Sequence, residues 1–87
     1  MIKGKTRSGF EFQLDENVMN NMELIEGLAA VDQGDITALP KVLVKLLGSE
    51  TKEALYNHVR SEDGRVPIDL LVKEVKEIFS ASKEIKN

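Results

Sequence analysis

The sequence contains no cysteine, and its only histidine is His58. The absence of cysteine excludes disulfide bonds and thiolate metal sites, and a single histidine leaves no second imidazole to share a metal. The opening segment MIKGKTRSG has no apolar run of signal-peptide length, and no stretch approaches the roughly 20 apolar residues of a membrane span. We therefore predict a soluble, intracellular protein with no membrane partner, and we expect His58 to lie on the surface.

Neither sign of charge dominates the chain, since 12 basic and 15 acidic residues give a net charge of −3. Nucleic-acid-binding proteins concentrate Lys and Arg on one face, whereas here both signs are mixed through most of the sequence. The one basic cluster comprises Lys3, Lys5 and Arg7. Such a cluster is more typical of solvated residues on an edge strand than of a phosphate-binding track. Nucleic acid is therefore not a predicted partner.

Residue groups that carry catalysis or bind cofactors are also missing. The sequence has no glycine-rich phosphate loop, no nucleophile elbow and no carboxylate pair with recurring spacing. Residues 61–69 are similar to a calcium-binding EF-hand loop, but aligning Ile68 with its eighth position puts Ser61 first, Arg65 fifth and Val72 twelfth. Those positions need oxygen ligands, with carboxylates at the first and twelfth, so the loop does not fit calcium. We predict no enzyme activity, no small-molecule substrate, and no catalytic, cofactor-binding or metal-binding residues.

The length of the chain predicts one domain spanning residues 1–87, which begins with a β-hairpin over residues 2–14. Two short runs are separated by Arg7-Ser8-Gly9. A two-residue loop would bring lysines onto the apolar face, whereas a three-residue loop with Gly9 at positive φ separates the two faces. The predicted register therefore pairs Ile2 with Leu14, Gly4 with Phe12, and Thr6 with Phe10.

Residues 15–80 show helical periodicity and predict about four short helices packed as a small bundle against the hairpin. We expect the first helix to begin at an Asp15 N-cap and to end at Gly34. Its apolar arc covers nearly half the helix, around a central stripe of Val18, Met22, Ile25, Leu28 and Ala29. Gly27 within it costs about 1 kcal/mol relative to alanine, which either close helix packing or a hinge or docking groove would explain.

The second helix is expected over residues 37–47, the third from a Ser49 cap to a stop at Ser61-Glu62-Asp63-Gly64, and the fourth from Pro67 or Asp69. The second is nearly apolar all round, so it is either the central helix or part of an interface. The predicted core stripe of the fourth helix is Ile68, Leu71, Val72, Val75, Ile78 and Phe79. Its predicted solvated face is Lys73, Glu74, Lys76, Glu77 and Lys83. Residues 81–87 are expected to fray, and the fold class is α+β, mainly α.

Several short sequence motifs, in their order along the chain, resemble those of the small tail assembly chaperones of long-tailed, siphovirus-type phages and prophages of Gram-positive bacteria. They are K-x-x-S-G-F-E-F, D-E-x-V with M-E-L-I-E, A-L-P-K-V-L-V-K-L-L-G, T-K-E-A-L-Y-N-H-V-R and E-D-G-R-V-P-I-D. The resemblance covers roughly residues 3–79. It implies a non-enzymatic protein of the bacterial host cytoplasm, absent from the virion, that binds the tape measure protein and helps the tail tube protein to polymerise. The family has no fixed catalytic motif, so the resemblance implies no active-site residues.

A protein that holds apolar helices needs apolar surface beyond that used by its own core. Five apolar residues lie off the predicted core stripes, and we predict that they bind the partner: Met19, Leu24, Val31, Val44 and Leu70. The alternative is that they are isolated surface residues, which are common in soluble proteins. We also expect self-association. The alternative function is a small phage regulatory or nucleic-acid-associated protein, supported only by the basic cluster near the N-terminus.

Overall fold

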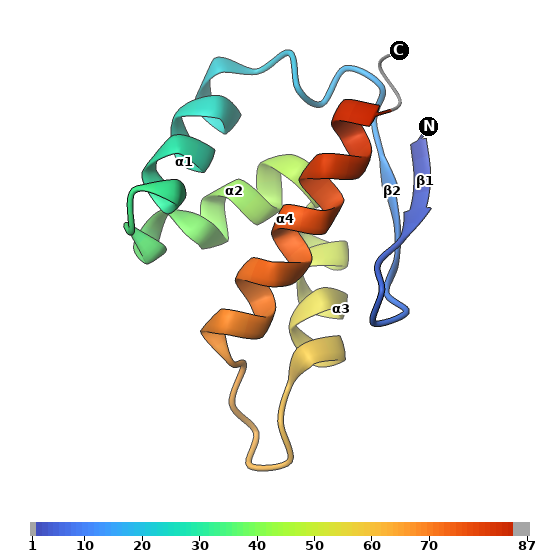
Figure 1. The fold of residues 1–87 in the computed structure, drawn as a ribbon, viewed down its shortest axis with the longest axis vertical. Helices are drawn as coiled ribbons and strands as arrows, with labels where there is room; N and C mark the ends of the chain where they lie inside the picture. Colours follow the sequence, from blue (N-terminus) through green and yellow to red (C-terminus); the bar gives the residue numbers. More distant parts are fainter. Residues whose placement is uncertain (1, 85–87) are drawn as a thin grey trace.

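The computed structural model describes the backbone of residues 2–84 and the side chains of residues 2–81. Within these residues an antiparallel hairpin of β1 (Ile2–Lys5) and β2 (Glu11–Leu14) precedes four α-helices. The helices are α1 (Met22–Asp32), α2 (Leu39–Leu47), α3 (Ser49–Val59) and α4 (Ile68–Glu84), and a 3-10 turn, η1 (Ile36–Ala38), leads into α2. The predicted α+β, mainly α fold class is confirmed (Figure 1).

The hairpin has the predicted register, with Ile2 opposite Leu14 and Gly4 opposite Phe12. The loop closes through a hydrogen bond from the Thr6 N–H to the Phe10 carbonyl at 2.9 Å, and Gly9 adopts φ +96°. A Cβ on Gly4 would lie 2.5 Å from the Phe12 ring, so only glycine allows this ring to lie across β1. One face of the hairpin is thereby apolar and covers the helices.

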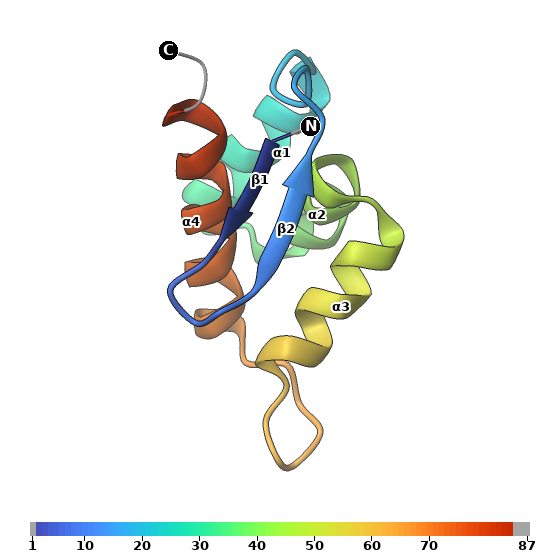
Figure 2. The ribbon, with the colours of Figure 1, turned by 90° about the vertical axis from the view of Figure 1, so that its right-hand side faces the viewer.

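Helix α2 occupies the centre of the molecule and packs against α1, α3 and β2 (Figures 1 and 2). Figure 2 shows the hairpin lying across the helices, with α4 on one side and α3 on the other. The buried core draws on all these elements: Ile2, Phe10, Phe12, Leu14, Leu24, Leu39, Val42, Leu43, Leu46, Leu55, Leu71, Val75 and Ile78. Among the leucine and valine residues of α2 only Val44 is exposed, at 41%, so α2 is central in its packing but is not buried all round.

Helix α1 begins at Met22, so the predicted start at Asp15 is wrong. The Asp15 carboxylate accepts a hydrogen bond from the Asn17 N–H at 2.8 Å, which closes a turn instead of a helix. The true N-cap is Asn21, whose side chain accepts from the Glu23 N–H at 3.0 Å. Asparagine side chains compete for backbone hydrogen bonds, so the asparagines that follow Asp15 favour turns over a helix here. Gly34, at φ +102°, lies just beyond the helix end as predicted.

The rotation of α1 also differs from the prediction. Leu24 is fully buried, whereas Met22 is 69% exposed and Ile25 is 40% exposed. The contact with α2 explains this rotation, because a Cβ on Gly27 would lie 2.5 Å from the Val42 Cγ2 atom. Gly27 therefore brings its own side of α1 against α2. Close packing, one of the two explanations for this glycine, is confirmed.

Within the described side chains, the burial of Ile68 and Glu74 in α4 differs from the prediction, and the side chain of Lys83 lies outside the described residues. Ile68, predicted in the core, is 57% exposed, and Glu74, predicted on the solvated face, is only 4% exposed. Glu74 is buried because it faces the hairpin loop, where it accepts hydrogen bonds.

In α3, Gly48 holds the N-cap position with no side-chain hydrogen bond, so Ser49 is not the cap. Helix α4 continues to Glu84, past the start of the expected frayed tail, and residues 85–87 lie outside the described residues.

Candidate partner-binding groove

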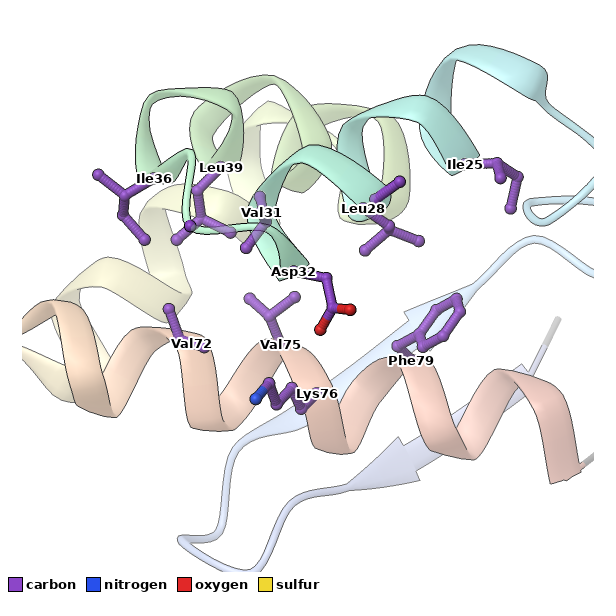
Figure 3. Close-up of a pocket in the computed structure, with 12 residues that line it drawn as sticks. Ile25, Leu28, Val31, Asp32, Ile36, Leu39, Val72, Val75, Lys76 and Phe79 are labelled. Carbon is purple, nitrogen blue, oxygen red and sulfur yellow. The ribbon is translucent and has the colours of Figure 1, made fainter.

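An open, mainly apolar groove of about 450 Å³ lies between α1 and α4. One wall is the α1 stripe of Ile25, Leu28, Ala29 and Asp32, and the other is the α4 stripe of Val72, Val75, Lys76 and Phe79. Val31, Gly34, Ile36 and Leu39 complete the lining. Figure 3 shows Leu28 and Val31 pointing towards α4, while Val75 and Phe79 point back towards α1. We call this set of residues the α1–α4 groove.

The groove exists because α1 and α4 are each held by other elements. Helix α1 packs on α2 through its glycine side, and α4 packs on β1 and α3. The two helices therefore flank the groove without packing closely on each other. Of its lining residues, Leu39 and Val75 are nearly buried, at 2% and 4% exposed, whereas Ile25 is 40% exposed.

The chemistry of the groove suits a hydrophobic ligand. Among the described side chains, those of residues 2–81, the ionisable lining residues are Asp32, on the α1 wall, and Lys76, on the α4 wall. Both are exposed, so they border an apolar interior without forming a buried polar site. The groove therefore offers burial of apolar surface and charge at its edges, and no arrangement for acid–base or nucleophilic chemistry.

A polar cluster on the other side of α4 was not predicted from the sequence. Glu74 accepts hydrogen bonds from the Thr6 hydroxyl at 2.7 Å and from the Ser8 hydroxyl at 2.9 Å. His58 Nε2 lies 2.9 Å from Ser8 Oγ, and the His58 ring lies against Phe10 with 5.3 Å between the ring centroids. These partners are 48 to 68 residues apart in the chain, and no local pattern links them.

The polar cluster contains serine, histidine and glutamate but is not arranged for nucleophilic catalysis. In a catalytic triad the histidine lies between the carboxylate and the serine, and it accepts the serine proton. Here Ser8 lies between Glu74 and His58 and donates its proton to Glu74. With the Ser8 hydroxyl donating to Glu74, the Ser8–His58 contact is a hydrogen bond when His58 Nε2 carries the proton and donates to Ser8 Oγ, and this depends on the tautomer of the ring. The cluster fastens the hairpin loop to α3 and α4.

The structure does not gather the five predicted partner-binding residues on one surface. Leu24 is fully buried, so the expectation that it lies off the core is wrong. Met19 and Val31 are half-buried and pack against the core. Val44 and Leu70 are 41% and 45% exposed, on different helices. Of the five, only Val31 lines the α1–α4 groove.

The groove residues Ile25, Leu28, Val72 and Phe79 were instead assigned to the core by the sequence pattern. Their apolar character was detected, but the pattern cannot distinguish a core-facing stripe from one that faces an open groove. The width of the α1 arc is the signal that could have revealed the groove. A helix that is apolar over nearly half its circumference can cover a core on one side and line a groove on the other.

The two remaining candidate sites are the loop compared with an EF-hand and the basic cluster of the hairpin. Asp63, in the loop compared with an EF-hand, accepts hydrogen bonds from the Ser61 hydroxyl and the Arg65 N–H, and these, the Ser61 bond first, lower the pKa of Asp63. Lys3, Lys5 and Arg7 are exposed, and Lys5 is opposite Glu11 in the hairpin. Over the described residues, no group of three or more His, Cys, Asp or Glu side chains could hold a metal ion.

No protein-family model, curated protein or solved structure matches this chain. Among the helices of residues 2–84, none is both long and apolar enough to cross a bilayer.

Proposed function

We propose that this protein is a tail assembly chaperone of a long-tailed phage or prophage of Gram-positive bacteria. In this role it binds the tape measure protein in the host cytoplasm and promotes assembly of the tail tube protein around it, without catalysing a reaction. The proposal comes from the resemblance of the ordered sequence motifs over residues 3–79. The structural observation that supports it is the α1–α4 groove, an apolar surface that the protein's own core leaves uncovered.

A chaperone for a long, aggregation-prone protein must shield apolar segments of its client from water. The groove combines nearly buried apolar residues with partly exposed ones, so a bound segment would lose water contact on its apolar side. The predicted five-residue surface does not support the proposal, because those residues are dispersed. The support now rests on the groove residues.

Co-expression with the tape measure protein of the same tail gene cluster tests the proposal. We expect the tape measure protein to move from the insoluble to the soluble fraction, and to elute with this protein in size-exclusion chromatography. The tape measure protein expressed alone is the control. If it stays insoluble in the presence of this protein and no complex elutes, the chaperone function is wrong.

A further inference from the structure

We infer that the α1–α4 groove takes a single amphipathic α-helix of the client, with a basic residue beside Asp32 and an acidic residue beside Lys76. The identity of the client rests on the proposed function; the helical form of the bound segment rests on the geometry of the groove alone.

The spacing of the lining residues indicates a helical occupant. On α1 the groove is lined by residues 25, 28, 29, 31 and 32, and on α4 it is lined by residues 72, 75, 76 and 79. Within these sets, residues 25, 28, 29 and 32 and residues 72, 75, 76 and 79 follow the i, i+3, i+4, i+7 pattern that a helix presents to a neighbouring helix, and Val31 lies beside the α1 set. In Figure 3, Leu28 and Asp32 point from α1 towards α4, and Val75 and Phe79 point from α4 towards α1. Each wall therefore has the side-chain arrangement that a helix presents when it packs on another helix.

The form of the walls disfavours an extended occupant. An extended peptide is usually bound by adding a strand to a sheet edge, where main-chain groups supply the hydrogen bonds. The groove is walled by two helices, whose backbone groups are already paired within each helix. A strand bound here would leave its own N–H and C=O groups unpaired against apolar side chains, which is costly. A helix satisfies its backbone internally.

The length of the stripes sets the size of the bound segment. Residues i and i+7 of a helix lie about 10.5 Å apart along its axis, so each wall contacts about two turns of an occupant. Two turns carry three or four apolar side chains on one face. A groove of about 450 Å³ is within the range of well-formed ligand pockets. The inferred segment therefore buries side chains at i, i+3 or i+4, and i+7.

The charges at the two walls define how the bound helix is flanked. Of the lining residues that the structure describes, Asp32 is the ionisable residue of the α1 wall and Lys76 that of the α4 wall. A helix with a basic residue on one flank of its apolar face and an acidic residue on the other would match both. A helix with two acidic flanks would meet Asp32 unfavourably. Complementary charge at the edges therefore selects among apolar helices.

A designed peptide tests the inference without requiring the natural client. The probe is an amphipathic helix of about 15 residues, near the shortest length that is helical in water. It carries leucine at i, i+3, i+4 and i+7, lysine and glutamate on opposite flanks, and a fluorescent label. We expect saturable binding to the full chain in an anisotropy titration, with an increase in total helicity by circular dichroism.

Two matched variants show where the peptide binds. Ile25 and Val44 are 40% and 41% exposed, but only Ile25 lines the groove. Ile25→Glu should weaken peptide binding about tenfold or more, because an apolar contact is lost and a carboxylate is desolvated. Val44→Glu should change it by no more than about twofold. Thermal melting of both variants verifies that they remain folded.

A protein variant and a probe peptide, each with its two charges exchanged, test the assignment of the flanking charges. We expect the double variant Asp32→Lys with Lys76→Glu to prefer a probe with its lysine and glutamate exchanged by about two- to fivefold, the range for exposed ion pairs. The preference should weaken at high salt. Equal affinity of both probes for the wild-type and double variant would overturn the assignment of the flanking charges.

Failure of this inference is distinguishable from failure of the proposed function. If the wild-type protein binds no helical probe, or if both glutamate variants weaken binding equally, the groove does not take a helix, even where the tape measure protein is solubilised. If the probe binds in the groove but the tape measure protein stays insoluble, the inference holds and the chaperone function is wrong. A dimer that Ile25→Glu dissociates, without probe binding, would assign the groove to a second copy and overturn the inference.

Discussion

The Thr6 hydroxyl donates a hydrogen bond of 2.7 Å to the buried carboxylate of Glu74, joining the hairpin loop to α4 across 68 residues of sequence. Thr6 Oγ1 also accepts from the Phe10 N–H at 3.1 Å, so this hydroxyl links the loop backbone to the helix. Since Ser8 supplies a second hydroxyl to Glu74, both carboxylate oxygens are engaged. These two hydrogen bonds make the burial of the Glu74 carboxylate favourable.

Replacement of Glu74 should destabilise the protein. Glu74→Ala removes the acceptor of two hydrogen bonds to a charged group and leaves the Thr6 hydroxyl buried, so we expect a loss of about 2–3 kcal/mol in the free energy of unfolding by urea denaturation. Lys73→Ala, at an exposed residue of the same helix, is the control and should cost less than about 0.5 kcal/mol. Equal effects of the two variants would show that the hydrogen bonds add no stability.

Gly27→Ala should also destabilise the protein, although alanine is the better helix former. The gain in helix propensity is about 1 kcal/mol, whereas the new Cβ would lie 2.5 Å from Val42 Cγ2, on a short side chain with few alternative positions. Because overpacking typically costs about 1–3 kcal/mol, we expect a net loss and a lower melting temperature.

The double variant Gly27→Ala with Val42→Ala tests this cause. It should be more stable than the sum of the two single effects predicts, because the shortened side chain at residue 42 makes room for the new methyl group. Additive effects, or a Gly27→Ala variant more stable than the wild type, would contradict close packing as the role of this glycine.

The hairpin was predictable from the sequence, down to its register. Its side chains alternate with a period of two, so a slip of one residue would move lysines onto the apolar face, and only one register separates the faces. Helix α1 was less predictable because its apolar arc is wide enough to allow several rotations. The glycine contact with Val42, which selects one rotation, depends on a residue of another helix.

The burial of Glu74 and the groove were not predictable for a related reason. A glutamate among lysines on an amphipathic helix normally faces solvent, and only the hydroxyls of a distant loop make its burial favourable. The groove depends on the distance between α1 and α4, and the hydrophobic pattern of the sequence does not predict that distance. Apolar residues of both walls were identified, but their surroundings required the tertiary structure.

Titration of Asp63 should show a midpoint below its ordinary value of 3.8, because hydrogen bonds from Ser61 and Arg65 favour the carboxylate. Since the pKa is lower in the folded than in the unfolded state, the stabilising contribution is complete above the ordinary value and is lost as the pH falls through the lowered one. Carboxyl NMR signals followed against pH measure the midpoint. Ser61→Ala should raise it, and Ser49→Ala, in α3, should not.

The basic hairpin residues should not produce nucleic-acid binding. Lys5 is opposite Glu11, and the net charge of the whole chain is −3, so the cluster lacks the extended positive surface that retains phosphates. We expect no retarded band in a gel-shift titration with duplex DNA or RNA at low salt. A retarded band that Lys3→Glu with Lys5→Glu abolishes would favour the nucleic-acid-associated alternative.

Filling the groove with an apolar side chain should block the client without adding charge. Ala29 is an exposed residue of the α1 wall, so Ala29→Phe would place a ring where the client's apolar side chains would bind. We expect the soluble yield of the co-expressed tape measure protein to fall severalfold, with the melting temperature of the variant changed by only a few degrees. Ala54→Phe is the matched control, because Ala54 is an exposed helical alanine of α3 that does not line the groove. If the soluble yield of the client falls equally with both variants, the cause is a general effect of added apolar surface. If Ala29→Phe leaves the yield unchanged, the client-binding surface lies elsewhere on the protein.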